Sequence, residues 1–142
     1  MIDGNASMIY EIVEQMKGLI PDAIVCCVGG GGLIGGVFKG LQATKIPDWD
    51  KGIHSQGIDN VVAVVGVETH GAASFHTAWK TGELVGIPEI NTIAKSLGAK
   101  TISRITFDLM KRHPGHVNAM VVSDGQAANA SWRFAGLTFL PN

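Results

Sequence analysis

Apolar and polar positions follow one another along the chain in a pattern that predicts helices separated by buried strands. Apolar residues over 8–16, and again over 33–41, recur at helical spacing with polar residues between them. Residues 23–28 form an unbroken apolar run, which is typical of a strand covered by helices on both faces of a parallel sheet. Gly18 stands where a left-handed residue would end the first helix, and Pro21 prevents its continuation.

The rest of the chain continues this alternation. Residues 46–60 are polar and contain proline and glycine, which indicates a long surface loop. Ser123 and Asp124 offer an N-cap for a closing helix that runs towards Phe134. Between these points we expect a strand over 61–67 and a helix over 72–80. Residues 82–98 should form turns or one short helix near 92–97, followed by a helix over 102–110 and a strand over 117–122. The predicted fold class is α/β, a three-layer parallel sheet with flanking helices.

Composition narrows the class of protein. The chain has 142 residues, of which 46% are hydrophobic, and a formal net charge of −1, which argues against a nucleic-acid-binding groove. No apolar run approaches the roughly 18 residues that a membrane span requires, so we expect no membrane partner. Cys26 and Cys27 are the only cysteines and are adjacent in a predicted strand, so they point to opposite faces and do not pair. The cytoplasm is the expected compartment.

Glycine is in excess and is concentrated at one place. Seven of the 19 glycines fall within residues 29–40, where a buried strand leads into a helix. Backbone N–H groups can converge there on an anion such as a phosphate, although a turn that needs only positive φ angles would also use glycine. A P-loop is excluded because Gly36 and Val37 follow Gly35 in place of Lys-Ser/Thr. A dinucleotide fingerprint, Gly30-x-Gly32-x-x-Gly35, is formally present but weak, because Asp48 and Asp50 lie in the predicted loop and Glu68 lies too far along the chain to be its acidic partner. The third possibility is a single phosphate on a small cofactor.

Several motifs occur in the order found in one enzyme family. They are Cys27-Val28-Gly29-Gly30-Gly31-Gly32-Leu33, Val67-Glu68-Thr69, Gly71-Ala72-Ala73-Ser74-Phe75-His76, the run from Ile93 to Thr101, and Val121-Val122-Ser123-Asp124. Over residues 3–134 the chain resembles the L-serine/L-threonine dehydratases, pyridoxal-phosphate enzymes of fold type II, and most of all their serine dehydratase branch. The resemblance implies a homodimeric lyase of amino-acid catabolism and gluconeogenesis. Such an enzyme deaminates L-serine or L-threonine to pyruvate or 2-oxobutyrate and ammonia.

The resemblance also implies two groups of ligand residues. Main-chain N–H groups would bind the cofactor phosphate at Gly29, Gly30, Gly31, Gly32 and Leu33. A monovalent cation, usually potassium, would lie beside this loop, held by the Glu68 carboxylate and by the carbonyl oxygens of Gly29, Ala72, Ser74, Leu97 and Ala99. Hard cations prefer such oxygen ligands. Without the resemblance, Glu68 is better interpreted as a surface-facing carboxylate at the end of a strand.

One component that the family requires is not found in the chain. Family members form a Schiff base between the cofactor and a lysine of a Ser-x-Lys-x-Arg-Gly motif, and none of the eight lysines here lies in that setting. We therefore expect no catalytic residue in this chain and no deamination by the chain alone. Residues 135–142 do not resemble the family, so we interpret residues 1–142 as a partial enzyme domain with a divergent tail, from a truncated product. The alternative is a non-catalytic remnant that binds phosphate or associates with another chain.

The remaining reactive side chains belong to no metal or nucleophile motif. The five histidines show no metal-binding spacing. We expect His113 and His116 to lie in a solvated loop, and His70 to be exposed near the site. Nothing near Cys26 or Cys27 favours a thiolate, so we expect both thiols to be inert.

Overall fold

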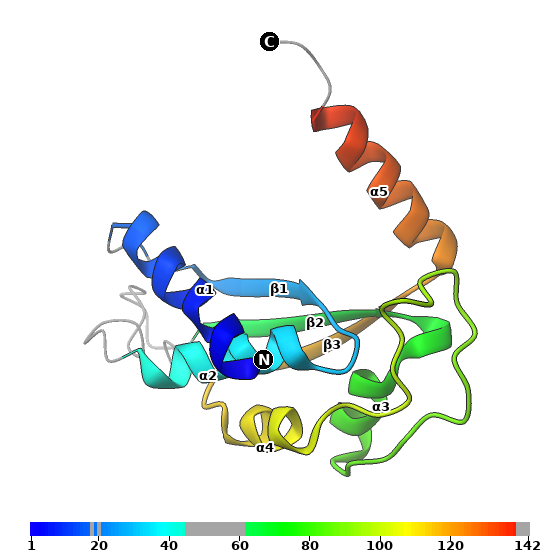
Figure 1. Ribbon diagram of the computed structural model, residues 1–142, viewed down its shortest axis with the longest axis horizontal. Helices are drawn as coiled ribbons and strands as arrows, with labels where there is room; N and C mark the ends of the chain where they lie inside the picture. Colours follow the sequence, from blue (N-terminus) through cyan, green and yellow to red (C-terminus); the bar gives the residue numbers. More distant parts are fainter. Residues whose placement is uncertain (18, 20, 45–61, 139–142) are drawn as a thin grey trace.

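The computed structural model describes residues 1–17, 19, 21–44 and 62–138, and it contains the predicted alternation of helices and strands (Figure 1). The predicted surface loop over 46–60 and the predicted helix-ending Gly18 lie outside these described residues. In chain order the elements are α1 (Ile2–Gln15), β1 (Ala23–Cys27), α2 (Gly32–Ala43), β2 (Ala63–Thr69), the 3-10 helix η1 (His70–Ala72), α3 (Ser74–Thr81), α4 (Arg104–Arg112), β3 (Val117–Val122) and α5 (Asp124–Thr138).

Three parallel strands form the sheet, in the order β1-β2-β3. Cys27 of β1 lies opposite Val67 of β2, and Thr69 of β2 lies opposite Val122 of β3. Parallel pairing places the carboxyl ends of the strands at one edge, so the glycine loop after β1, η1 after β2 and the start of α5 after β3 all lie there. The α/β class with a parallel sheet and flanking helices is confirmed, and β2 lies two residues later than predicted.

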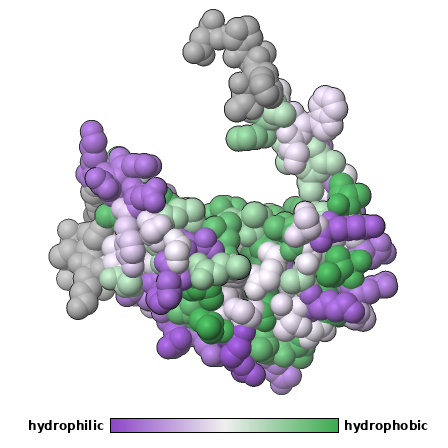
Figure 2. Space-filling view, in the orientation of Figure 1, coloured by the Kyte–Doolittle hydropathy of each residue, from purple (hydrophilic) through white to green (hydrophobic). Residues whose placement is uncertain are grey.

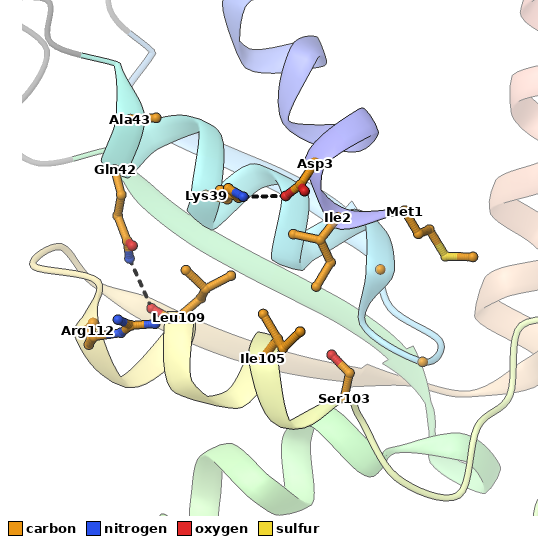
Figure 3. Close-up of a pocket in the computed structure, with 12 residues that line it drawn as sticks. Met1, Ile2, Asp3, Lys39, Gln42, Ala43, Ser103, Ile105, Leu109 and Arg112 are labelled. Carbon is orange, nitrogen blue, oxygen red and sulfur yellow. Dashed lines mark hydrogen bonds and ion pairs between the residues drawn. The ribbon is translucent and has the colours of Figure 1, made fainter.

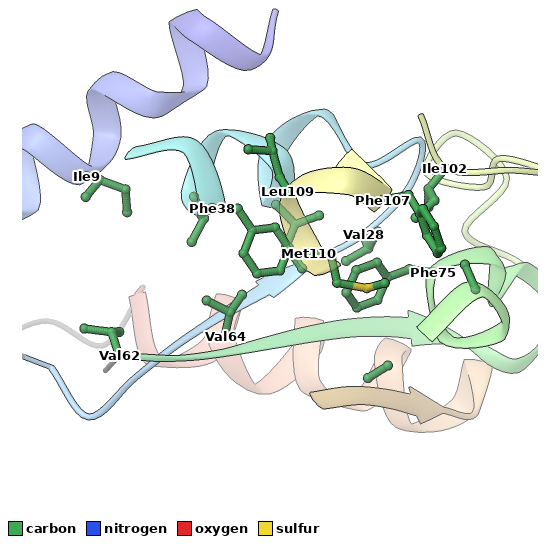
Figure 4. Close-up of a cluster of buried hydrophobic side chains, with 14 residues drawn as sticks. Ile9, Val28, Phe38, Val62, Val64, Phe75, Ile102, Phe107, Leu109 and Met110 are labelled. Atoms are coloured by element: carbon green, nitrogen blue, oxygen red, sulfur yellow. The ribbon is translucent and has the colours of Figure 1, made fainter. Parts of the chain in front are cut away.

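The core lies between one face of the sheet and the helices α2, α3 and α4 (Figure 4). Val64 in β2, Phe38 in α2 and Phe75 in α3 are fully buried. Gly66 makes room for the Phe75 ring, because a Cβ at Gly66 would lie 2.6 Å from the ring carbon Cε1. Burial of each large apolar side chain contributes about 1.5–3 kcal/mol to stability.

The opposite face of the sheet is exposed, which differs from the prediction of strands covered on both faces. Val25 in β1 is 64% exposed and Met120 in β3 is 50% exposed, and the register places both on the face that carries Val65 and Val67. α5 extends away from the sheet (Figure 1), and apolar surface is visible along the strands below it (Figure 2). The unbroken apolar pattern of β1 thus predicts the strand correctly, while one of its faces is bare in the described part of the chain.

α1 packs along α2 through two glycines. A Cβ at Gly36 would lie 2.4 Å from the Cβ of Asn5, and one at Gly40 would lie 2.6 Å from the Cβ of Ile9. Side chains at these positions would therefore push the two helices apart. The close packing holds α1 beside the first turn of α2, where the glycine loop ends.

The ends of α2, α3 and α4 lie within two residues of the predictions, whereas α1 begins six residues before the predicted pattern and α5 ends four residues beyond Phe134. Lys17 has a left-handed conformation after α1, with φ of 49°. The turn closes around it, because the Leu19 amide donates to the Met16 carbonyl at 2.9 Å. The predicted N-cap of α5 is confirmed, since the Gln126 amide donates to the Ser123 hydroxyl at 3.1 Å and the Ser123 amide to the Gln126 side chain at 2.8 Å. Among the described residues, no helix has both the length and the apolar character needed to cross a membrane.

Candidate functional site

The chain passes from β1 into α2 through a loop of four glycines. Val28 is buried at its start, and its amide donates to the Val67 carbonyl at 3.0 Å. Gly31 forms the N-cap of α2 with φ of 88°, a conformation that residues other than glycine rarely adopt. The first amides of an α-helix have no acceptor within the helix, so the loop ends on hydrogen-bond donors that suit an anion.

The carbonyl groups of the glycine loop are bound by the start of α4. The Ser103 amide donates to the Gly30 carbonyl at 3.1 Å, and the buried Thr106 hydroxyl donates to the Gly31 carbonyl at 2.9 Å. Ser103 is itself the N-cap of α4, since its hydroxyl accepts from the Thr106 amide at 3.1 Å. Two carbonyl oxygens that would repel an anion are thus engaged by donors of the protein.

The base of the loop is in close contact with a second segment, residues 94–99. A Cβ built on Gly29 would lie 2.1 Å from the Leu97 carbonyl oxygen, and one on Gly30 would lie 3.8 Å from the Cβ of Ala99. The Leu97 amide donates to the Ala94 carbonyl at 3.1 Å, which makes this segment a tight turn. The structure therefore has the turn rather than the short helix that the sequence also allowed over 92–97.

Glu68 lies inside the protein at the end of β2 and is 2% exposed, so the interpretation of a surface-facing carboxylate is wrong. Its carboxylate accepts hydrogen bonds from the amides of Phe75 at 2.9 Å and His76 at 2.7 Å, in the first turn of α3. Burial raises the pKa of Glu68, and the hydrogen bonds from His76 and Phe75 oppose this rise. The carboxylate therefore satisfies the amides that begin α3.

The residues expected to hold a cation come from three segments that meet at this edge of the sheet. Gly29 contacts Leu97 as described, and a Cβ at Gly98 would lie 3.4 Å from the Cβ of Ala72. Ser74 is fully buried beside Glu68, and its hydroxyl has no protein partner among the described residues. No group of three or more His, Cys, Asp or Glu in the described part of the chain could hold a metal, so a cation here would depend on carbonyl oxygens and one carboxylate.

Comparison with known proteins identifies the family. A family model described as pyridoxal-phosphate dependent enzyme matches residues 1–140. The chain belongs to this family. Mouse L-serine dehydratase/L-threonine deaminase is 37% identical over 132 residues, which cover 93% of this chain and 36% of the mouse protein. A rat serine dehydratase-like protein is 39% identical over 93% of this chain and 35% of its own length. The resemblance predicted from the motifs is confirmed, and the chain spans about a third of the length of the curated relatives it matches.

Solved structures of pyridoxal-phosphate dependent enzymes and their relatives share the fold of the chain. A fungal L-serine ammonia-lyase from Rhizomucor miehei matches with a TM-score of 0.79 and 38% identity, covering 95% of this chain and 38% of that chain. Maize serine racemase matches with a TM-score of 0.69 and 26% identity, over 91% of this chain and 35% of its own. In both solved structures, the part that resembles this chain makes up less than two fifths of the polypeptide.

In this family member, the glycine loop borders a cavity of about 920 Å³ (Figure 3). Gly30, Gly32 and Ser103 line one part of it, and residues from the start of α1, from the last turns of α2 and from α4 line the rest. Lys39 and Asp3 form an ion pair within this lining. The sequence did not predict the cavity, because it depends on the packing of α1 and α4 on either side of α2.

The histidines of this family member correct one prediction. His113 lies inside the protein, with its Nε2 atom 2.9 Å from the Val62 carbonyl oxygen and its ring 5.3 Å from the Phe38 ring. The prediction of a solvated loop is therefore wrong for His113, because β2 and α2 cover the end of α4 there. It is correct for His116, which is exposed, and His70 is exposed as expected.

Three further residues at the same edge of the sheet were not predicted to belong together. Thr69, Thr92 and Asp124 are joined by side-chain hydrogen bonds, although 55 positions separate the first from the last. The sequence identified Asp124 as part of a helix cap and of one family motif, but gave it no contact with Thr69 or Thr92. No sequence signal indicates this contact, because it depends on the loop after α3 returning to the end of β2.

Proposed function

We propose that the chain forms the cofactor-phosphate segment of an enzyme that deaminates L-serine or L-threonine to pyruvate or 2-oxobutyrate and ammonia. The observation that carries the proposal is the glycine loop between β1 and α2, whose carbonyls are bound by Ser103 and Thr106. The names of the relatives, which are serine dehydratases and threonine deaminases, support the substrate class.

The phosphate of the cofactor is proposed to bind the main-chain amides of Gly29, Gly30, Gly31, Gly32 and Leu33. Two observations fit a phosphate there. Gly31 has the positive φ that begins α2 with free amides, and any side chain on Gly29 would collide with Leu97. The loop therefore offers backbone donors that carry no side chains, on a base that is packed closely against Leu97.

A potassium ion is proposed to bind beside the loop, through the Glu68 carboxylate and the carbonyl oxygens of Gly29, Ala72, Ser74, Leu97 and Ala99. The buried carboxylate supports this site, since burial alone raises the pKa of Glu68 and a neighbouring cation would favour the ionised form. The buried Ser74 hydroxyl without a protein partner also lies at this position. A hard monovalent cation fits a set made only of oxygens.

The residues of this chain are proposed to bind and orient rather than to move protons. When bound, pyridoxal phosphate supplies an electron sink for the bonds at the α-carbon of the amino acid. The lysine that joins the cofactor in the family has no counterpart among the eight lysines here. We therefore propose that residues 1–142 are a partial domain, whose family motifs lie within residues 3–134, and that the complete enzyme is a cytoplasmic homodimer.

Hydrogen exchange at the amides of residues 29–33 tests the phosphate site. Inorganic phosphate and pyridoxal phosphate are each expected to slow exchange there, and Gly31→Ala is expected to abolish the effect, because φ is +88° and Thr106 blocks a Cβ at 2.9 Å. Gly125→Ala is the matched control, since its Cβ would meet only the Ser123 hydroxyl at 3.8 Å. Exchange that is unchanged by either ligand would contradict the phosphate site.

A coupled pyruvate assay with L-serine, pyridoxal phosphate and potassium tests the proposed lack of a catalytic lysine. The chain alone is expected to release no pyruvate above the rate of free cofactor. Pyruvate release that depends on the chain would show that one of its own lysines acts on the cofactor. That result would contradict the proposed division of the enzyme between this segment and the rest of the polypeptide.

A second candidate function is association with another chain without catalysis. The observation that favours it is the exposed apolar face of the sheet, on which Val25 is 64% and Met120 is 50% exposed. Light scattering of the purified chain tests it. A monomer that stays monomeric at high concentration would exclude self-association through this face.

A further inference from the structure

Three side chains link three separate segments at the carboxyl end of the sheet. The Thr69 hydroxyl at the end of β2 donates to the Thr92 hydroxyl at 2.9 Å. The Thr92 hydroxyl donates to one carboxylate oxygen of Asp124 at 2.5 Å, and the other oxygen accepts from the Ile93 amide at 3.0 Å. Asp124 is the first residue of α5. We call this chain of hydrogen bonds the Thr69–Thr92–Asp124 relay.

The relay has a fixed direction because it ends on a carboxylate. Asp124 can only accept hydrogen bonds when ionised, so the hydroxyl protons of Thr92 and Thr69 must both point along the relay towards it. Thr92 also accepts from the Ala94 amide at 3.2 Å. Thr69 is 6% and Thr92 is 5% exposed, so solvent cannot readily replace these partners. The relay therefore holds residues 92–94 in one position against the sheet.

Residues 92–94 lead directly into the turn that contacts the glycine loop. The amides of Leu97 and Gly98 both donate to the Ala94 carbonyl, at 3.1 and 3.2 Å. The Leu97 carbonyl oxygen then lies against Gly29, at 2.1 Å from the position of a Cβ on that residue. At the other end of the segment, the Asn91 amide donates to the Gly71 carbonyl at 2.8 Å. A displacement of Thr92 would therefore shift the turn that supports the base of the glycine loop.

We propose that Asp124 is a positioning residue for the phosphate and cation sites, and that it acts through Thr92 on the turn formed by residues 94–98. The inference rests on the proposed function for the identity of the ligand. It adds a residue 92 positions beyond Gly32, the last glycine of the loop. Asp124 touches neither proposed ligand, and its contribution is to keep Leu97 and Ala99 where the proposed ligands would meet them.

Substitutions along the relay test this inference in the full chain. Thr92→Val removes the central hydroxyl and keeps the shape of the side chain, while Thr92→Ser keeps the hydroxyl. Asp124→Asn replaces one carboxylate oxygen by an NH₂ group, which cannot accept the hydrogen bond from either Thr92 or Ile93. Asp108→Asn on the exposed surface of α4 is the matched control for loss of one negative charge.

Two measurements are made on each variant. The first is hydrogen exchange at residues 29–33 and 94–99, and the second is the dissociation constant for inorganic phosphate. We expect Thr92→Val and Asp124→Asn to speed exchange in both segments and to raise the dissociation constant about tenfold, as for a lost hydrogen bond to a charged acceptor. Thr92→Ser and Asp108→Asn are expected to match the unsubstituted chain. Rescue by serine separates the hydroxyl from a loss of packing.

The outcomes separate this inference from the proposed function. Faster exchange confined to residues 92–94, or unchanged exchange in Thr92→Val, would overturn the positioning role. If the unsubstituted chain binds no phosphate, the proposed function fails, and exchange at residues 29–33 in Thr92→Val against Thr92→Ser still decides whether the relay controls the loop.

Discussion

Gly29 is the position at which a single methyl group should do most damage to the site. In Gly29→Ala the new Cβ would lie 2.1 Å from the Leu97 carbonyl oxygen and 3.2 Å from its carbonyl carbon. Both are backbone atoms, so no side-chain rotation can relieve the overlap. Either the end of β1 or the turn at residues 94–98 must move by about 1 Å to restore a normal contact distance.

The size of the effect follows from this enforced movement. Overpacking a close contact costs about 1–3 kcal/mol, and here the displaced turn is also held by the Thr69–Thr92–Asp124 relay. We expect the free energy of unfolding to fall by about 2–3 kcal/mol in Gly29→Ala. Gly30→Ala is the matched control one residue away, because its Cβ would meet only the Cβ of Ala99 at 3.8 Å. That variant should stay within about 0.5 kcal/mol of the unsubstituted chain.

Urea unfolding followed by circular dichroism measures both variants under the same conditions. Parallel transitions with equal slopes allow the two free energies to be compared directly. If Gly29→Ala unfolds within about 0.5 kcal/mol of Gly30→Ala, the close approach of Leu97 to Gly29 does not constrain the loop. The turn at residues 94–98 would then not support the glycine loop.

Three further predictions concern titratable groups. Glu68→Gln leaves one acceptor oxygen for the two amides of α3 that the carboxylate binds. We therefore expect the free energy of unfolding to fall by about 1–2 kcal/mol. Equal stability of the variant would contradict the role of the carboxylate at that helix. Burial lowers the pKa of His113 from 6.5, so on acidification the unfolded chain binds a proton before the folded chain does, and the free energy of unfolding should fall as the pH drops below 6.5. Unfolding measurements at pH 7.5 and 5.5 should show a smaller difference for His113→Gln. An equal difference in that variant would refute the role of His113. Burial raises the pKa of the Cys26 thiol to about 11 while Cys27 is exposed, so maleimide should label Cys27 first, which peptide mass spectrometry can check.

The sequence predicts the site best where its geometry is local. The apolar run of β1, the glycines after it and the helical pattern of α2 lie within residues 23–43, so one strand, one loop and one helix follow from adjacent residues. The burial of Glu68 could not be predicted from adjacent residues alone, because the carboxylate is covered by α3 and binds the amides of Phe75 and His76. Without the family motifs, a carboxylate at the end of a strand is usually exposed.

Predictions failed where the outcome depends on segments that are distant in the sequence. His113 is buried because it contacts Val62, directly before β2, and Phe38 of α2. The His-Pro-Gly-His sequence around it does not indicate those contacts. The exposed face of the sheet differs from the prediction because contacts that the sequence pattern implies are not made in the described part of the chain. The strands carry an apolar pattern for two covered faces, and the described part of the chain covers only one of them, which leaves Val25 and Met120 exposed.

Phosphate binding and deamination depend on different kinds of groups, and this difference decides what the segment can do alone. A phosphate site made of main-chain amides requires only that a strand, a loop and a helix keep their positions. Ser103 and Thr106 hold the carbonyls of the loop, and the turn at residues 94–98 supports its base. Deamination requires a side-chain amine at the cofactor, and neighbouring backbone geometry cannot replace a missing lysine. We therefore expect phosphate binding to persist in this chain without catalysis, with an affinity limited by the stability of the loop.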